Sequence, residues 1–599
     1  METSIQRKSA SLPEEHRTKL MDWYREAERL NSAWVSRAKK SFRFATGFDQ
    51  WDADARATLE DADKPALQFN YLLPTLMVLC GYQRQSRFDY RLYPRRGATI
   101  PVARLGTELM KHTMDVCQGA YQMSMAFQDG ATCGKGFVQL DVNYDHDPFF
   151  GDFEIKRVSP FSILEDQNNN GYLLNDGRFV CARHYPNKEF LKLKYPKMAE
   201  EIEAGARYAD GGNQYYSDIN SLEDYDKGGR MPEMAAVGPD QVEIRDWWYR
   251  TNTVRHYLVH LPTLTTAALK DGKYRETKAK VEASPKKDDF KFFDRVSTVL
   301  HRAIMLGDEC CLEYFENPLK GLVLFPYERF TPYWFDGYVF GVIDNLIDPQ
   351  EEGNKRYSQT LHHLNQSASS GWEHKTPVND EAERKLEDYG STPGVNLNID
   401  DYGGHLKRIE PAQLPQGHFT LSEMAHGKIQ YISGINPDLM GARPEHQESG
   451  RKAYLRQQAG LTVSETIFDN YRYMAEKFGQ ILWEGIRTLG VYTEEEIYGV
   501  VNEASLRDFI LPNGGLDLSL LEDIKNGRYG VKIETTQHLP TARVAQFEEL
   551  LDIAKLSMEM GNPVDVETII EASDSPYREK MLEDIRARKQ MMQKAMING

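Results

Sequence analysis

Apolar side chains recur every three or four residues along several long stretches of the chain, which is the spacing of one face of an α-helix. The first stretch begins at an S-x-x-E capping box formed by Ser11 and Glu14, with Pro13 in the first turn, and its apolar face comprises Leu20, Trp23, Tyr24, Ala27, Leu30 and Trp34. The same spacing predicts helices at about 101–127, 348–368, 379–388, 419–433, 444–489, 541–560 and 576–597.

Strand patterns lie between these helices. Residues 137–144 and 153–160 alternate apolar with polar side chains, and residues 241–343 contain several β-branched and aromatic runs of strand length. A lysine-rich interruption at 270–288 is expected to be exposed, and the Gly-, Asp- and Tyr-rich residues 205–233 are expected to form a surface loop. The sequence therefore predicts an α+β protein that is mainly helical.

Glycine and proline interrupt the helical pattern in the C-terminal half. Residues 371–416 are polar and broken by both residue types. The helix at 419–433 is separated from the next one by Gly434, Pro437 and Gly441, which predicts a helix pair or a sharply kinked helix. Residues 497–534 show a mixed pattern, and the chain contains no internal repeat.

The charge balance is acidic. The 599 residues include 73 Lys and Arg against 90 Asp and Glu, a net charge of −17. Proteins that hold DNA are usually basic, at least locally, because phosphate neutralisation supplies most of the non-specific affinity. The composition leaves two interpretations open, which are no role with nucleic acid and contact with nucleic acid without adhesion.

Cysteines and apolar runs limit the location of the protein. Six cysteines without a C-x-x-C pair are typical of a reduced compartment, where they serve as small buried hydrophobic residues. The N-terminus lacks the apolar region of a secretory signal, and the longest apolar runs, such as residues 71–80, are about half the length that spans a bilayer. We expect neither export by this route nor a membrane span.

No pattern in the sequence predicts catalysis. DGATCGKGF at 129–137 superficially resembles a phosphate loop, but the interval from Gly130 to Gly134 is one residue too short and Gly136 occupies the place of the hydroxyl residue. A glycine turn between a helix and a strand is the better interpretation. The acidic clusters and the His362–His363 pair have the features of solvated side chains. We expect no enzyme activity, metal or cofactor.

Three sequence blocks in order resemble the portal (head–tail connector) proteins of short-tailed double-stranded-DNA bacteriophages. The first block, 68–97, carries Asn70, Gly81, Gln83, Arg84, Arg87, Asp89 and Pro94. The second, 335–364, carries Gly341, Val342, Asp348, Pro349 and Gln350. The third, 433–486, carries Gly434, Ile435, Gly441, Ser449, Gly450, Arg456, Gln457, Gln458, Gly460, Phe468, Asp469 and Asn470. A weaker fourth match lies in the tail at 538–553 and 571–574.

The resemblance implies a portal fold with a wing, a helical stem, a β-containing clip at the outer end and a crown, assembled as a ring of about twelve copies. On this basis we expect five regions: an N-terminal wing at 1–240, a β-containing clip and stem at 241–345, a stem helix and tunnel loop at 346–416, a long kinked wing helix at 417–495, and a crown at 496–599. The chain ends soon after its last helix, so the long C-terminal barrel of some relatives is expected to be absent.

The resemblance also implies a function and partners. The ring would sit at one capsid vertex of the virion, made in the host cytoplasm, and would pass double-stranded DNA during packaging and ejection without reading its sequence. Terminase and then tail adaptor proteins would dock within about 250–345, and capsid and scaffolding proteins would contact the ring. The alternative is another phage structural or DNA-metabolism protein, such as a nuclease or terminase component.

Two basic residues are candidates for the DNA channel. Lys355 and Arg356 precede the polar segment 371–416, and ring symmetry would repeat them as basic rings on an acidic wall. We expect at least one of them to face the lumen and part of 371–416 to project inward. In relatives, an Arg more often lies two to three residues before this position. The alternative to a place in the channel is that Lys355 and Arg356 form salt bridges between subunits.

Overall fold

The computed structural model describes most of the chain. It covers residues 12–203, 241–435, 464–503 and 528–535, with gaps at 87, 96–97, 145, 263–264, 270, 284–288, 309, 320–322, 369–370, 376–379, 391, 393 and 410–415, together with Phe509, Ala554, Lys555 and Ile585. The predicted surface loop at 205–233 and almost all of the predicted tail helices lie outside these residues.

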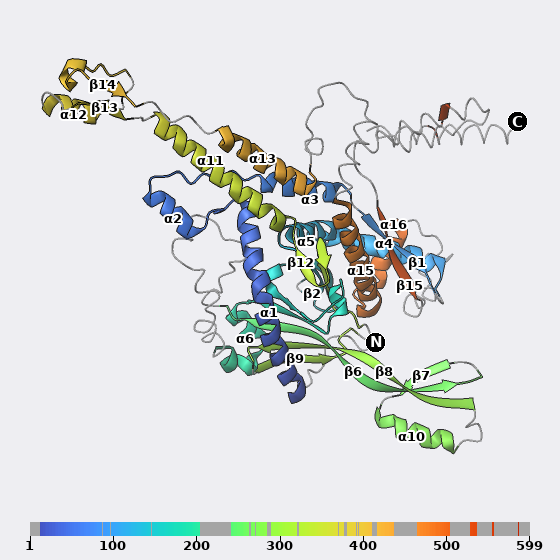
Figure 1. Cartoon of the computed structure of the whole chain (residues 1–599). Helices are drawn as coiled ribbons and strands as arrows, with labels where there is room; N and C mark the ends of the chain where they lie inside the picture. Colours follow the sequence, from blue (N-terminus) through green and yellow to red (C-terminus); the bar gives the residue numbers. More distant parts are fainter. Residues whose placement is uncertain are drawn as a thin grey trace.

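Helices and strands are mixed along the described chain, in agreement with the predicted α+β class (Figure 1). The helices are α1 (Glu14–Thr46), α2 (Ala53–Asp61), α3 (Leu72–Gln85), α4 (Ile100–Val116), α5 (Gly119–Cys133), α6 (Lys188–Lys194), α10 (Asp271–Glu282), α11 (Ile347–Ala368), α12 (Asp380–Tyr389), α13 (Gln416–Ser433), α15 (Glu465–Leu489) and α16 (Glu494–Glu503). The strands are β1 (Phe88–Pro94), β2 (Gly136–Asn143), β3 (Asp152–Val158), β4 (Ile163–Glu165), β5 (Phe179–His184), β6 (Ile244–His260), β7 (Thr265–Leu269), β8 (Phe290–Leu306), β9 (Cys310–Glu316), β10 (Tyr327–Phe330), β11 (Tyr333–Phe335), β12 (Tyr338–Phe340), β13 (Trp372–His374), β14 (Leu406–Arg408) and β15 (Tyr529–Thr535).

The largest hydrophobic core lies where α3, α4, α5 and α15 pack around the β1–β15 pair and the three-stranded sheet β10–β2–β3. Phe127 on α5 stacks on Phe330 of β10 with ring centroids 4.9 Å apart, and Tyr471 on α15 meets both rings edge-on. The antiparallel pairing of β1 with β15 brings two segments together that are more than 400 residues apart in sequence. The core therefore joins the first half of the chain to α15 and β15.

A second, six-stranded sheet follows the order β4–β5–β6–β8–β9, with β7 paired to β6. The helix α1 packs on one face of this sheet, where Tyr24 meets Trp247 in a buried cluster with Leu20 and Ala27. These side chains confirm most of the predicted apolar face of α1. Leu30 does not belong to that face, since 40% of it is exposed.

Beyond this sheet, β6 and β8 continue together as a long two-stranded ribbon that projects from the body (Figure 1). Residues 251–299, which include β7 and α10, are called the extension below. The sequence predicts only an exposed interruption at 270–288, but this segment contains α10. The helix packs on the ribbon because Tyr274 stacks on His256, with ring centroids 3.9 Å apart, and meets Phe292 edge-on.

Two details of the predicted helices are wrong. The single helix predicted at 101–127 is two helices, because α4 ends at Val116 and α5 begins at Gly119. Between them Gln118 has a φ of 50°, a left-handed conformation through which an α-helix does not continue. The first helix starts at Glu14 with Pro13 as its N-cap rather than in its first turn, and Ser11 lies outside the described residues.

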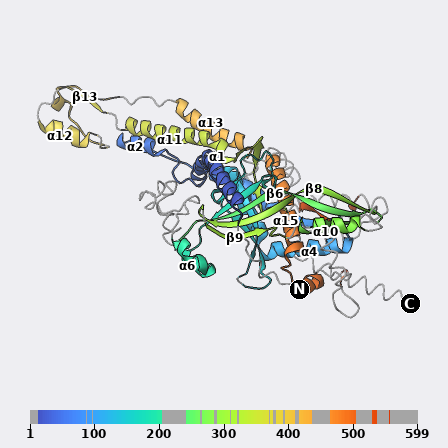
Figure 2. The same cartoon turned by 90° about the horizontal axis from the view of Figure 1, so that it is seen from below.

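The helices α11 and α13 pack side by side and form an arm that points away from the core (Figures 1 and 2). The predicted helix at 348–368 matches α11, and the one at 419–433 matches α13. At the far end of the arm, β13 pairs with β14 and α12 lies beside them. These three elements and their connections, residues 371–409, are called the cap below. The sequence predicts α12 but misses the strand pair.

Candidate functional site

The cap is a small unit with polar contacts of its own. Tyr402 is buried, and its hydroxyl donates to the Ala382 carbonyl at 2.9 Å. The indole of Trp372 donates to the Gly390 carbonyl at 2.7 Å. These bonds tie α12 to the strand pair, so a segment that is polar and glycine-broken in sequence has a defined structure at the tip of the arm.

The base of the arm is joined to the body by a row of polar side chains on α11. Gln350, Asn354 and Ser358 follow one another at intervals of four residues, which places them on one face of the helix, and all three are buried. Each accepts a hydrogen bond from a backbone amide of the segment that leads into α3. Gln350 accepts from the Tyr71 amide at 3.2 Å and Asn354 accepts from the Phe69 amide at 3.1 Å. Ser358 accepts from the Leu67 amide at 2.9 Å.

A further buried side chain completes this junction. Gln50, which follows α1, accepts hydrogen bonds from Gln350 at 3.2 Å and from Asn354 at 2.8 Å. Gln350 also donates to the Phe69 carbonyl. The first and second family-like blocks therefore meet here, because Gln350 belongs to one block and the backbone of Phe69 and Tyr71 to the other. Asn354 and Ser358 are contributors that the sequence does not single out.

The two basic channel candidates lie further along α11 and have carboxylate neighbours. The Lys355 amine lies 3.5 Å from the Glu351 carboxylate, and the Arg356 guanidinium lies 2.6 Å from Glu352, each pair one helical turn apart. The Glu351 carboxylate also forms an ion pair with the Lys40 amine of α1 at 2.8 Å. Within one subunit, both basic charges are thus balanced by acidic side chains of the same helix.

Two other family-like residues fasten buried parts of the core. Gln83 on α3 donates to the Tyr471 hydroxyl at 3.1 Å, with both side chains buried. Asn470 on α15 donates to the Pro332 carbonyl at 3.0 Å. The first contact joins the first block to the third, and both contacts assign these side chains a role in packing.

The remaining motif residues are scattered. Asp348 and Pro349 form the first turn of α11, Asp469 pairs with Arg472, and Arg84 is exposed on α3. Arg87, Arg456, Gln457 and Gln458 lie outside the described residues. The motif residues that the structure describes do not come together into one surface site.

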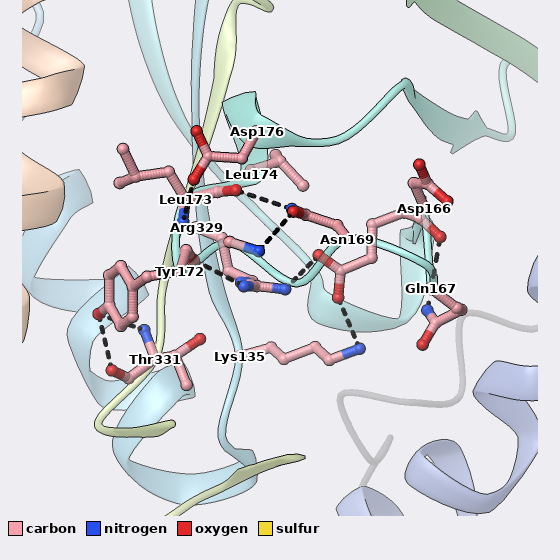
Figure 3. A network of polar contacts seen from close by, with 12 residues as sticks. Lys135, Asp166, Gln167, Asn169, Tyr172, Leu173, Leu174, Asp176, Arg329 and Thr331 are labelled. Atoms are coloured by element: carbon pink, nitrogen blue, oxygen red, sulfur yellow. Dashed lines mark hydrogen bonds and ion pairs between the residues drawn. The ribbon is translucent and has the colours of Figure 1, made fainter. Parts of the chain in front are cut away.

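A network of buried charges lies between β4, β10 and the turn after α5 (Figure 3). The carboxylate of Glu165 receives the Lys135 amine at 2.7 Å and the Arg329 guanidinium at 2.5 Å. Lys135 also donates to Asn31 of α1 at 3.3 Å. Burial favours the neutral acid, but Arg329 and Lys135 hold the pKa of Glu165 below its usual range.

The glycines around Lys135 confirm a tight helix-to-strand turn. Gly134 ends α5 with a φ of 89°, and a Cβ on it would lie 2.8 Å from the Phe340 backbone. A Cβ on Gly136 would lie 1.8 Å from the Ala126 carbonyl oxygen. Lys135 points into the protein toward Glu165, where it is 4% exposed, so its amine does not face a phosphate pocket.

Other chemical candidates in the described residues are also structural. Burial raises the pKa of Cys80 to about 12 and that of Cys117 to about 11, which keeps both thiols protonated and poorly nucleophilic at neutral pH. No group of three or more His, Cys, Asp or Glu side chains suitable for a metal ion occurs among the residues that the structure describes. In the same residues, no helix is long and apolar enough to cross a membrane.

Comparison with protein-family models matches residues 21–598 to the Phage P22-like portal protein family. The chain belongs to this family. The resemblance drawn from the three sequence blocks is therefore confirmed, and the match extends over nearly the whole chain, including α15 and the tail. A comparison with curated proteins finds no match.

Membership of the portal family gives the general role and location of the protein. Portal proteins are structural head–tail connectors involved in DNA packaging, and they are located at the capsid vertex of the virion. The main features of the described chain are its arm with the cap, the polar junction at the base of the arm and the extension. The apolar spacing predicts the two helices of the arm, but it does not predict the hydrogen bonds that join the arm to the body.

Proposed function

We propose that this chain is the portal subunit that forms a closed ring at one capsid vertex and surrounds the channel for DNA packaging and ejection. The family match over residues 21–598 is the observation that carries the proposal. The charge of −17 supports it, because about twelve copies would carry on the order of −200 charges and would resist adhesion of sliding DNA. Synthesis in the host cytoplasm, contacts with capsid and scaffolding proteins, and the absence of cofactor and enzyme activity belong to the same proposal.

Terminase, and later the tail adaptors, would dock on the cap in this proposal. The resemblance alone predicts docking at 250–345, as the β-containing region at the outer end of a helical stem. The cap fits that description better, because β13 and β14 lie in it and the paired helices α11 and α13 carry it away from the core. Its eight Asp and Glu against five Lys and Arg within 371–409 give it an acidic surface for partners with basic faces.

The order of the helices changes which residues we assign to the DNA channel. Residues 371–416 are predicted to project inward because they are taken as the connection to the long kinked helix. In the structure they join α11 to α13, whereas the connection from α13 to α15 is 434–464, most of which lies outside the described residues. We therefore propose that the channel wall runs along α11, with Lys355 and Arg356 as its candidate residues, and that 371–409 serves docking rather than the wall.

Mass measurement of the purified protein tests the ring. We expect on the order of 800 kDa, from about twelve copies of 68.8 kDa. In that ring, Lys355→Ser with Arg356→Ser should leave the mass unchanged and alter DNA packaging or retention, because only the charge of the channel wall changes. A monomer would contradict the portal proposal, and a double variant that no longer forms rings would place the two residues at a subunit interface.

Charge reversal separates the two docking sites. Glu381→Lys with Glu383→Lys changes two exposed residues of α12 and should weaken terminase binding to the ring by about tenfold, because acidic contacts become repulsive. The matched control is Lys278→Glu with Lys280→Glu on α10, which alters the same number of exposed charges in the 250–345 region. Binding would be measured by surface plasmon resonance. Loss in the control and not in the cap variant would return the docking site to 250–345.

A further inference from the structure

The extension differs in charge from the rest of the chain. Residues 251–299 contain ten Lys and Arg against six Asp and Glu, a net charge of +4, in a chain of net charge −17. The described part of the extension projects from the body, at the opposite end of the molecule from the cap in both views (Figures 1 and 2). A local reversal of charge on a projecting element favours contact with an acidic partner.

The strand register separates the two faces of the ribbon. Residues directly opposite each other in an antiparallel pair lie on the same face, and successive residues alternate between faces. One face carries the His256–Asp294 and Leu258–Phe292 pairs and is covered by α10 through Tyr274. The other carries the pairs Thr253–Ser297, Arg255–Arg295, Tyr257–Phe293 and Val259–Lys291. We call this second side the arginine face.

On the arginine face, two guanidinium groups come from directly opposite positions. Like charges at such positions destabilise a strand pair. Asp294, the carboxylate beside Arg295 in sequence, lies on the other face and binds His256 at 2.6 Å. Within the described part of the chain, Arg255, Arg295 and Lys291 have no carboxylate partner. The three cations are therefore left for an anion outside the subunit.

Aromatic side chains adjoin these cations. Tyr257 and Phe293 stack with ring centroids 5.3 Å apart and an interplanar angle of 14°, and Phe293 is 39% exposed. A rigid, partly apolar ridge next to paired guanidinium groups suits a polyanion with alternating phosphates and apolar sugar and base edges.

We propose that the arginine face binds the phosphate backbone of double-stranded DNA on the interior side of the portal ring. This inference rests on the proposed function for its orientation: if the cap faces out of the capsid toward terminase, the extension lies at the inner end, where packaged DNA accumulates. The contact is independent of sequence, because guanidinium–phosphate bonds position a duplex without reading its bases. It differs from the channel, which must not hold DNA, since the extension is a separate projection.

The test uses the assembled ring and a fluorescent 20-base-pair duplex, with anisotropy titrations over a range of salt concentrations. Arg255→Thr with Arg295→Thr should weaken binding by about tenfold and reduce the slope of log affinity against log salt by about two, because two phosphate contacts are lost. The matched control, Lys278→Ala with Lys280→Ala, removes two positive charges from the helix on the opposite face and should change the affinity by less than about threefold. Arg255→Lys with Arg295→Lys keeps both charges and should retain the salt slope.

Mass measurement of each variant separates the possible outcomes. A selective loss in the threonine variant, with its ring intact, supports DNA binding by the arginine face. Equal affinities for all rings, or equal losses in the threonine variant and its control, overturn it while leaving the portal proposal in place. Rings that dissociate only in the threonine variant also overturn it, because the face would then contact the acidic surface of a neighbouring copy. Failure of the native chain to form a ring counts against the portal proposal instead.

Discussion

Replacement of Glu165 by glutamine should lower the free energy of unfolding by about 3–5 kcal/mol, because it leaves two buried cations without their shared anion. Glu165, Lys135 and Arg329 are 5, 4 and 6% exposed, so water cannot take the place of the carboxylate. Glutamine has nearly the same shape, and the loss will report the charge rather than a cavity. Chemical denaturation followed by tryptophan fluorescence would measure it, since the Lys135 amine lies 4.3 Å from the ring centroid of Trp34.

The loss of stability caused by Glu165→Gln should decrease as the pH falls. The folded protein holds the pKa of Glu165 below its ordinary value of 4.5, because Arg329 and Lys135 outweigh the burial that favours the neutral acid. A lowered carboxyl pKa contributes stability above the unfolded value, and this stability is lost as the pH falls through the folded pKa. The difference between the glutamine variant and the native chain should therefore be full at neutral pH and shrink below about 4.5.

A surface pair provides the control. Glu534 pairs with Arg91, and their side chains are 57% and 64% exposed, so Glu534→Gln should cost less than about 1 kcal/mol. Equal losses in the two variants would mean that the buried network contributes no more than a surface ion pair. A small loss in the Glu165 variant would contradict the prediction, because it would show that the two buried cations do not depend on the carboxylate.

The predictable part of this structure is the part that periodic patterns encode. The stripe on α1, the strands at 137–144 and 153–160, and the helix entered at Asp348–Pro349 were all visible because side-chain spacing reflects which face is buried. The glycine turn at 129–137 could also be recognised, since a phosphate loop needs a different spacing and a strand before it.

Contacts between distant segments could not be predicted in the same way. Lys135 looks like a surface lysine until Glu165 and Arg329 are placed beside it, and nothing local to Lys135 encodes that placement. The helix α10 was missed because its polar sequence shows no apolar stripe, and a single tyrosine anchors it to the ribbon. The arm was predicted as separate helices, but the return of α13 along α11 depends on the cap that joins them.

The burial of the polar residues at the base of the arm could not be predicted from their spacing either. Gln350, Asn354 and Ser358 have the spacing of a solvated polar stripe, yet all three are buried against the backbone that precedes α3. Gln350→Leu should lower the free energy of unfolding by about 3 kcal/mol, because the Tyr71 amide and the Phe69 carbonyl lose their partner while still enclosed. Thermal unfolding of the variant ring would measure the loss.

Proteolysis distinguishes a local effect from a global one. Loss of the Gln350 bonds should free the segment before Tyr71, so chymotrypsin should cleave after the exposed Phe69 faster in the variant than in the native ring. Gln359→Leu is the control, since Gln359 is exposed on the same helix and holds only Arg356. Faster cleavage at Phe69 with unchanged cleavage in the cap would show that the junction at Gln350 fixes the arm to the body. Equal rates in both variants would mean that apolar packing of α11 on α13 holds the arm without these hydrogen bonds.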